Sequence, residues 1–270
     1  MPKYLARRTT IWLWLVTSAT PALAIDLAPP RGEPGEFGIS VGAEYTTGKY
    51  GGTTSTDIGY FPVTLRYETE RWLWWLTIPY LIVKGPGDVV IIGGGGMGGH
   101  RTVTTTTTRR TDSGIGDIVA AASYRLLTQT EVRPALDLAG KVYFGTADET
   151  KGLGTGENDY AVQLGITKDI GVLTWSGTGG YLVTGDPAGV AYKDIFYGRL
   201  DVEHEFERHT VGVAFDAQQA TAPGGDAPAK LTGYLTTRLG KHAKLTGYLL
   251  RGLSDASPEW GAGVTFALQY

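Results

Sequence analysis

The sequence predicts an all-β protein, a single antiparallel transmembrane β-barrel. Three observations lead to this fold class. Apolar residues recur at every second position in segments of about 11 to 14 residues, which is the period of a strand and enough for a tilted strand to cross a bilayer. Short connections alternate with longer ones along the chain. The last segment ends on an aromatic residue, Tyr270.

The N-terminal residues predict export. Lys3, Arg7 and Arg8 give a positive start, residues 11–16 a short apolar centre, and residues 22–24 a small-x-small cleavage pattern. The apolar run is far shorter than the roughly 20 residues of a spanning helix. The expected organisation is a signal peptide at 1–24, a Pro- and Gly-rich periplasmic lead-in at 25–35, and an outer-membrane barrel at 36–270.

The composition limits the possible partners. The chain has 270 residues, no Cys and a formal net charge of −3. Removal of residues 1–24 takes away three positive charges and no negative ones, leaving 21 Lys and Arg against 27 Asp and Glu, a net charge of −6. Such a balance gives no support to nucleic-acid binding. Because no later segment approaches 18 consecutive apolar residues, a membrane location requires a closed barrel, in which every backbone group is satisfied.

Twelve alternating segments set the expected strand number. They are 36–47, 57–68, 71–84, 114–127, 131–145, 157–168, 171–184, 192–205, 208–219, 229–239, 243–253 and 259–270. A hairpin wrongly split or missed near 48–56 or 85–113 would give ten or fourteen strands instead. Tight turns are expected at 69–70, 128–130, 169–170, 206–207 and 240–242. Since outer-membrane barrels have short periplasmic turns and long extracellular loops, both termini are expected in the periplasm.

The two faces of these segments differ in polarity. One face is apolar with aromatic residues near the segment ends, as the interfacial girdles of a barrel require. The opposite face carries charges of both signs, and these residues are expected to line the lumen: Glu44, Arg66, Glu68, Arg125, Arg133, Asp137, Lys141, Arg199, Asp201, Glu203, Asp216, Lys230, Arg238 and Lys244. In a soluble sandwich, the alternative fold, the same face would be solvated.

The final segment predicts how the barrel is assembled. Its apolar face runs to the terminal aromatic residue, and this arrangement resembles the signal by which outer-membrane barrels are recognised for assembly. Phe is the usual terminal residue of that signal, and Tyr is a variant. The residues assigned to it are Trp260, Phe266, Leu268 and Tyr270. The expected partners are therefore the barrel assembly machinery and outer-membrane lipid.

The connection 85–113 has an unusual composition. It contains the apolar run 89–92, glycines at 93–96, 98 and 99, and a Thr run at 104–108. No Gly-Lys-Ser/Thr follows the glycines, so they do not form a phosphate-binding loop. One interpretation is a mobile extracellular loop. The other is that the apolar run folds inward and narrows the pore, with Arg101, Arg109 and Arg110 near the mouth.

Three stretches carry a family resemblance: SGIGDIVAAASYRL at 113–126, TGENDYAVQLGITKDIG at 155–171 and LSDASPEWGAGVTFALQY at 253–270. Over somewhat more than half of its length, the chain resembles the bacterial outer-membrane family of putative MetA-pathway of phenol degradation proteins, often called transporters. The resemblance implies a β-barrel and suggests uptake of small molecules, including aromatic ones. It carries no functional residue over to this chain.

The expected function is the passive passage of small solutes through the lumen. An enzyme is an alternative, because outer-membrane phospholipases and proteases use barrels of this size. His100 falls in the long loop and His204, His209 and His242 beside the short turns, and none has a nucleophile or metal-ligand partner in a recognisable pattern. No catalytic group, cofactor or metal site is therefore expected. The remaining alternative is a structural or adhesive barrel with a plugged lumen.

Overall fold

The computed structural model describes residues 35–86, 89–91, 99–101, 109–187, 192–221 and 224–270. The predicted signal peptide and all but the last residue of the lead-in lie outside these residues. The described elements are β1 (Phe37–Gly48), β2 (Thr56–Glu68), β3 (Trp72–Gly85), β4 (Val89–Ile91), β5 (Gly99–Arg101), β6 (Arg110–Ile115), β7 (Ile118–Leu127), β8 (Ala135–Phe144), η1 (Glu149–Lys151), β9 (Asp159–Ile170), β10 (Leu173–Val183), β11 (Ile195–Phe206), β12 (His209–Gln218), β13 (Ala229–Arg238), β14 (Ala243–Gly252) and β15 (Trp260–Gln269).

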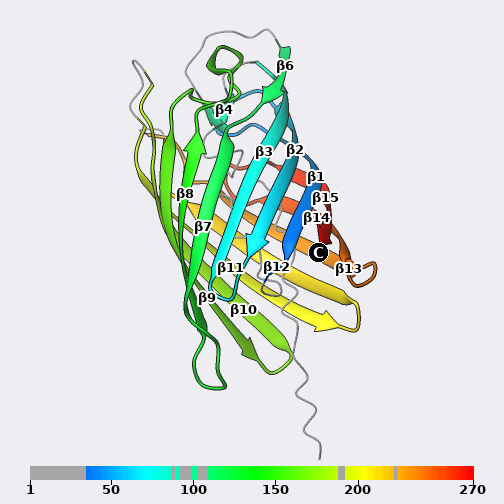
Figure 1. The fold of residues 1–270 in the computed structure, drawn as a ribbon. Coiled ribbons are helices and arrows are strands. Elements are labelled where there is room, and N and C mark those ends of the chain that lie inside the picture. Colours follow the sequence, from blue (N-terminus) through cyan, green and yellow to red (C-terminus); the bar gives the residue numbers. More distant parts are fainter. Residues whose placement is uncertain (1–34, 87–88, 92–98, 102–108, 188–191, 222–223) are drawn as a thin grey trace, which may run out of the picture.

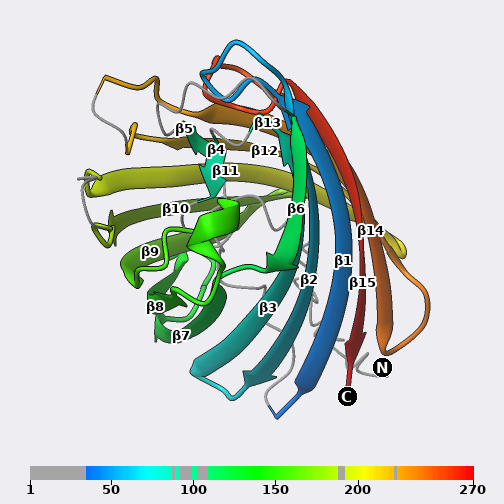
Figure 2. The ribbon, with the colours of Figure 1, turned by 90° about the horizontal axis from the view of Figure 1, so that it is seen from above.

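The strands close into one antiparallel barrel, as Figures 1 and 2 show. The barrel strands pair with their neighbours in chain order, while β4 and β5 form a separate hairpin. β1 pairs with β15 over ten residues from Gly38↔Gln269 to Thr47↔Trp260. The main sheet has thirteen strands, but β6 and β7 lie end to end against β3 and occupy one position, so the barrel has twelve. The predicted strand number is confirmed. None of the helical structure in the described part of the chain could span a bilayer.

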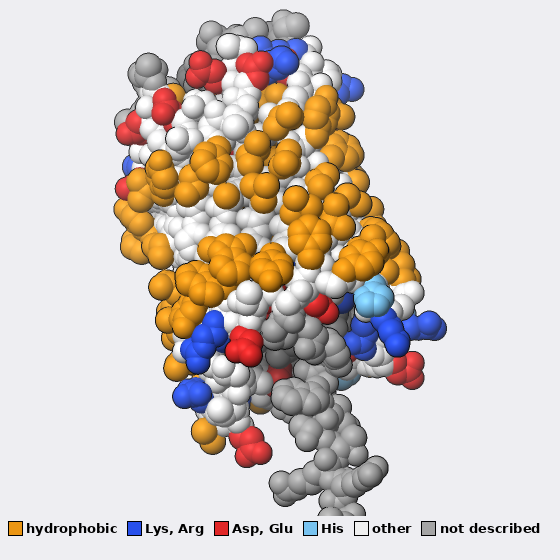
Figure 3. Space-filling view, in the orientation of Figure 1, with side chains coloured by type: hydrophobic (Ala, Val, Ile, Leu, Met, Phe, Trp, Pro, Cys, Tyr) orange, Lys and Arg blue, Asp and Glu red, His pale blue; other side chains and the backbone are white. Residues whose placement is uncertain are grey.

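The outer surface explains why these residues form membrane strands. Along most strands, side chains alternate between exposed and buried, and the exposed positions away from the strand ends are apolar residues or glycine. Figure 3 shows these apolar side chains as two bands around the visible face, with charged residues above and below. Exposed aromatic residues lie near both strand ends: Phe37, Tyr67, Trp72, Trp74, Trp175 and Phe206 toward the short turns, and Tyr45, Tyr80, Phe144, Tyr160, Phe196 and Trp260 toward the long loops. This is the belt with two girdles that a barrel presents to lipid.

The short turns fall close to their predicted places, with two corrections. The turn expected at 169–170 is formed by Gly171 and Val172, because Gly171 supplies a positive φ of 65° that lets β9 continue to Ile170. The turn expected at 128–130 extends over 128–134, since the chain bends through 131–133 before β8 begins.

The fourth predicted segment also differs from the structure. It begins at Arg110 rather than at residue 114 and is interrupted at Gly116 and Asp117. Tyr80 pairs with Ile115 and Thr77 with Val119. The chain therefore advances four residues in this strand while β3 advances three. One extra residue against the neighbouring strand is a β-bulge. Pro79 of β3 lies opposite it, and the Gly116 amide donates to the Pro79 carbonyl.

The predicted loop 85–113 contains structure of its own. Residues 89–91 and 99–101 pair as the short hairpin β4–β5, and the upper part of the fourth barrel strand occupies 110–113. The glycines at 93–96 and 98 and the Thr run at 104–108 lie outside the described residues.

Candidate functional site in the barrel lumen

The most buried charged cluster centres on Arg199 of β11. Its Nη1 lies 3.2 Å from both carboxylate oxygens of Asp216 on β12, and its Nη2 lies 3.1 Å from Oδ2 of Asp201. The Tyr234 hydroxyl of β13 lies 2.8 Å from Oδ1 of Asp201 and 2.9 Å from Oε2 of Glu203, and its one proton is shared between the two carboxylates. These side chains lie on the inner face because the alternate positions of the same strands are exposed and apolar. Three strands, β11, β12 and β13, thus bring these residues together.

Two further ion pairs, formed by residues predicted to line the lumen, lie on the inner face nearer the short turns. Arg125 of β7 donates from Nε to Oδ1 of Asp137 on β8 at 2.7 Å, and the two residues are direct cross-strand partners. Arg66 and Glu68 of β2 pair at 2.5 Å, with the Glu68 side chain buried. Opposite charges on the inner face therefore neutralise one another in pairs.

The other predicted lumen residues occupy three kinds of position. Glu44, Lys141 and Lys230 are buried on the inner faces of β1, β8 and β13. Arg238 and Lys244 are half-buried at the turn end, where Arg238 pairs with Glu205 at 2.6 Å. Arg133 is the exception: it lies exposed in the turn before β8 and donates to the Thr128 carbonyl at 3.2 Å, because that turn is longer than expected.

Lys230 is held by charge rather than by hydrogen bonds. Its Nζ is buried without a hydrogen-bond partner, and the negative charges of Asp216 and Glu44 act on it electrostatically. Glu44 accepts a hydrogen bond at Oε2 from the Tyr248 hydroxyl, while its Oε1 is likewise buried without a partner. This group joins β1 to β12 and β13 across the inside of the barrel.

Three inner tyrosines each reach over a glycine to the second strand along. Tyr197 crosses Gly180 to Gln163, Tyr234 crosses Gly212 to Asp201 and Glu203, and Tyr248 crosses Gly263 to Glu44. A Cβ on any of these glycines would lie 2.2–2.3 Å from its tyrosine ring, so the missing side chain makes the crossing possible. The glycines are thus a condition for the polar contacts of the wall.

An apolar inner wall was missed by the sequence reasoning. Near the long-loop end, one buried cluster joins inner residues of β2 and β3 to loop residues: Tyr50, Ile58, Tyr60, Leu81, Val83, Val89, Ile91, Ala147 and Leu153. A second cluster continues along β7 to β11: Val119, Tyr143, Ala161, Leu182, Ile195 and Tyr197. The signal was present in the third segment, WLWWLTIPYLIV, which is apolar on both faces. The sequence of a strand that is buried on both faces is a nearly continuous run of apolar residues.

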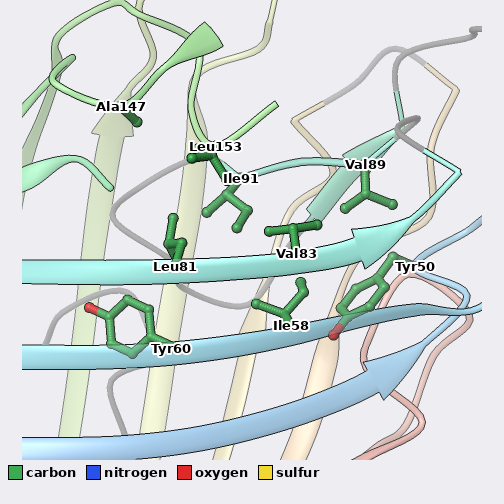
Figure 4. Close-up of a cluster of buried hydrophobic side chains, with 9 residues drawn as sticks. All are labelled: Tyr50, Ile58, Tyr60, Leu81, Val83, Val89, Ile91, Ala147 and Leu153. Atoms are coloured by element: carbon green, nitrogen blue, oxygen red, sulfur yellow. The ribbon is translucent and has the colours of Figure 1, made fainter. Parts of the chain in front are cut away.

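The apolar start of the long loop folds inward. Figure 4 shows Val89 and Ile91 lying over Val83, Leu81 and Ile58, the inner residues of β2 and β3. Val89 is 4% exposed and Ile91 3% exposed, so both are removed from water. Of the two interpretations of this loop, inward folding of the apolar run is the one that the structure supports.

Polar residues near the mouth of the barrel also form hydrogen bonds and ion pairs. Arg109 donates to the Ser55 carbonyl at 2.8 Å and lies 3.2 Å from Asp57, and Arg110 lies 2.5 Å from Asp112, so neither cation faces the mouth unpaired. The Tyr50 hydroxyl is 2.8 Å from Thr46 Oγ1, and burial raises the pKa of Tyr50 far above its usual range. The side chain of Arg101 lies outside what the structure describes.

Three histidines form contacts near the short turns, while the side chain of His100 lies outside what the structure describes. Nδ1 of His204 lies 2.7 Å from the Val172 carbonyl, Nδ1 of His209 3.1 Å from Thr237 Oγ1, and Nδ1 of His242 2.9 Å from the Gln269 carbonyl. Within the described residues, no group of three or more His, Cys, Asp or Glu side chains could hold a metal ion.

The predicted assembly residues lie where the barrel closes. Trp260, Phe266 and Leu268 point outward from β15, which pairs with β1. Tyr270 exchanges both backbone hydrogen bonds with Phe37, at 2.8 and 2.9 Å, and its exposed ring stacks on His242 at 5.9 Å. The last residue therefore takes part in the pairing of β1 with β15 that closes the barrel.

Comparisons with known proteins agree with this fold. No family model and no curated protein matches the sequence. The structure is similar to the COG4313 outer membrane channel from Pseudomonas putida F1, with a TM-score of 0.71, 13% identity, and coverage of 91% of this chain and 100% of that chain. Weaker matches are the translocator domain of autotransporter NalP from Neisseria meningitidis (TM-score 0.49, 10% identity, 87% and 88% coverage) and the P. putida toluene transporter TodX (0.43, 10%, 92% and 94%). The likeness shows the fold of an outer-membrane β-barrel, whereas membership of the MetA-pathway family stays a prediction.

Proposed function

We propose that the protein is an outer-membrane channel for the passive passage of small solutes. The observation that carries the proposal is that the inner face has two apolar clusters over β2 to β11 at the long-loop end and a buried charged cluster over β11 to β1. Further charged residues lie on β2, β7 and β8. A purely structural barrel needs no such arrangement. A passage with apolar and charged surfaces suits amphipathic solutes, for which each surface contacts the part of the molecule that it resembles.

The proposed constriction is the apolar cluster in which Val89 and Ile91 of β4 pack with inner residues of β2 and β3. A barrel of twelve strands lies between the eight that are filled by side chains and the sixteen that leave an open channel. The inward position of Val89 and Ile91 would narrow the passage further, at the end that carries the long loops. By the usual asymmetry of such barrels, we place this end outside the cell and both termini in the periplasm.

A liposome swelling assay tests the proposal. Vesicles containing the refolded protein should swell in sugars, amino acids and small phenolic compounds at rates that fall with solute size, while vesicles without protein should not. A barrel closed by its own side chains would pass none of these solutes.

A plugged structural barrel is the second candidate, and one observation favours it. The inner charges pair with one another, as in Arg199 with Asp216 and Arg125 with Asp137, rather than face an open passage unpaired. Absence of swelling with every solute, from a protein that migrates as a folded barrel on an unheated gel, would support this candidate. No arrangement of the described residues suggests an enzyme.

A further inference from the structure

One half-buried cation on the inner face has no carboxylate partner. Lys244 is the second residue of β14, close to the turn that follows β13, and its position in the alternation faces the lumen. Within the described residues, its ammonium group forms neither an ion pair nor a hydrogen bond. The other described cations of the inner face contact a carboxylate or are buried: Arg66, Arg125, Arg199 and Arg238 in the first case, Lys141 and Lys230 in the second. Lys244 therefore keeps its charge available to a group from outside the chain.

A serine hydroxyl lies two strands away at the same height of the barrel. Lys244 is the cross-strand partner of Ala267 on β15, and Ala267 is the partner of Ser40 on β1. The Ser40 side chain is half-buried, and its hydroxyl forms no hydrogen bond with any other described residue. Because Ala267 carries only a methyl group, no long side chain of β15 stands between the hydroxyl and the ammonium group.

Arg66 leans toward the same place from β2. Its cross-strand partner on β1 is Gly38, and a Cβ on Gly38 would lie 2.6 Å from Cγ and 2.8 Å from Cδ of Arg66. The arginine stem thus crosses β1 where that strand has no side chain. Its Nη2 lies 2.5 Å from Oε2 of Glu68, while its Nε is buried without a hydrogen-bond partner. Of the charges around Lys244, that of Arg66 acts on it most strongly.

The three side chains offer the chemistry of an anion site. Lys244, Ser40 and Arg66 present only donors that the described residues leave unused, and two of the three groups are positively charged. Glu36 and Glu205 act on Lys244 with the opposite sign, but neither is in ion-pair contact with it. A half-buried charge beside a like charge is unfavourable without a partner, so folding alone does not require a cation here. A carboxylate supplies the missing negative charge and two acceptor oxygens.

From these observations we propose that Lys244, Ser40 and Arg66 bind the carboxylate group of a small organic anion at the end of the lumen that carries the short turns. The inference rests on the proposed channel function and names its solute class, amphipathic molecules whose charged end is a carboxylate. The apolar clusters lie toward the long loops, whereas this turn-end site lies at the opposite end of the lumen. A cation at the far end of a narrow passage draws an anion through it.

Binding and permeation of butyrate test the turn-end site, with butyramide as the neutral probe of nearly the same shape. Lys244→Met removes the charge at similar side-chain length, and Lys244→Arg keeps it. The matched control is Lys241→Met, which removes the same charge from an exposed position in the preceding turn. Saturation-transfer NMR on the refolded barrel, in a detergent without carboxylate groups, measures binding and needs no open channel. The reversal potential in a potassium butyrate gradient across a planar bilayer measures permeation.

We expect the wild type to bind butyrate but not butyramide, and Lys244→Met to bind butyrate at least about tenfold more weakly, because a hydrogen bond to a charged group is lost. Lys244→Arg and Lys241→Met should bind as the wild type does. Lys244→Met should also be no less stable in urea, which excludes misfolding as the cause; if it does not fold, Ser40→Ala replaces it and should weaken binding by a smaller factor. Unchanged butyrate binding in the folded variant, or equal binding of the two probes by the wild type, would overturn the site. Butyrate binding that depends on Lys244, in a protein that conducts no ions, would support the site and overturn the channel function.

Discussion

Tyr197 lies over Gly180 and donates a hydrogen bond from its hydroxyl to Oε1 of Gln163, 3.0 Å away and two strands distant. The contact joins three strands, because the ring crosses the middle strand where that strand has no side chain. The two other inner tyrosines that cross glycines repeat the arrangement elsewhere on the wall. The Tyr197 contact favours the observed register, since a shift of β10 by two residues, which keeps the same face inward, would put the side chain of Thr178 or Leu182 under the ring.

The Gly180→Ala variant should destabilise the barrel. The new Cβ would lie 2.3 Å from Cζ of Tyr197, and overpacking of this kind costs about 1–3 kcal/mol. The control is Gly179→Ala on the same strand, where the Cβ points into open space and should leave stability unchanged or slightly raised. Urea unfolding in detergent micelles gives the free energy of unfolding for both. Equal stability of the two variants would show that the ring moves without cost.

Arg199→Met should be among the most destabilising single changes on the inner face. It leaves the buried carboxylate of Asp216 without its partner, and breaking a buried pair in this way costs roughly 3–5 kcal/mol. Arg251→Met is the matched control, because Arg251 is exposed on the outer face near the loop end. In planar bilayers, the Arg199→Met channel should also become more selective for cations, as shown by its reversal potential in a salt gradient. A stable variant with unaltered ion selectivity would show that the buried charged cluster does not contact the passing solute.

The double variant Val89→Ser/Ile91→Ser should widen the passage. Both side chains are buried against Leu81 and Val83, and each loses on the order of 1.5–3 kcal/mol of burial when it is replaced by a polar group. The hairpin should then leave the inner wall more often, and the mean single-channel conductance should rise. Val90→Ser is the control, since Val90 lies between them and is only half-buried. Deletion of residues 88–108 should have a larger effect in the same direction, and unchanged conductance in both variants would contradict the constriction.

Deletion of Tyr270 should impair assembly. The residue exchanges two backbone hydrogen bonds with Phe37, where the first and last strands meet, and its aromatic ring completes the predicted assembly signal. Tyr270→Phe keeps the ring and the backbone and should assemble normally. The fraction of protein that migrates faster on an unheated gel measures assembly. Normal assembly of the truncated protein would argue against both the signal and the closing contact.

The period-two pattern by itself determined most of the fold. Strands of this length with one apolar face bury that face in lipid only as a closed barrel, so the strand number, the antiparallel order and the pairing of the first and last strands follow from local sequence. The inner and outer positions of each strand follow as well, because successive side chains of a strand point to opposite faces of the sheet. Glu44, Lys141 and Arg199 were predicted for the inner face on this basis, and they lie there.

Only the tertiary structure decided what the inner residues contact. The alternation of β11 assigns Arg199 to the lumen, but its pairing with Asp216 depends on the register between two strands, which the turn geometry fixes. Likewise, the sequence of the run 89–92 is compatible with a surface loop or an inserted one, and the packing of Val89 and Ile91 with Leu81 and Ile58 decides between them. The bulge at Gly116 and Asp117 arises where β6, β3 and the loop 145–158 meet, and no local pattern in 113–126 marks it. The arrangement of the lumen is set by contacts between segments distant in sequence, and a local periodicity does not encode these contacts.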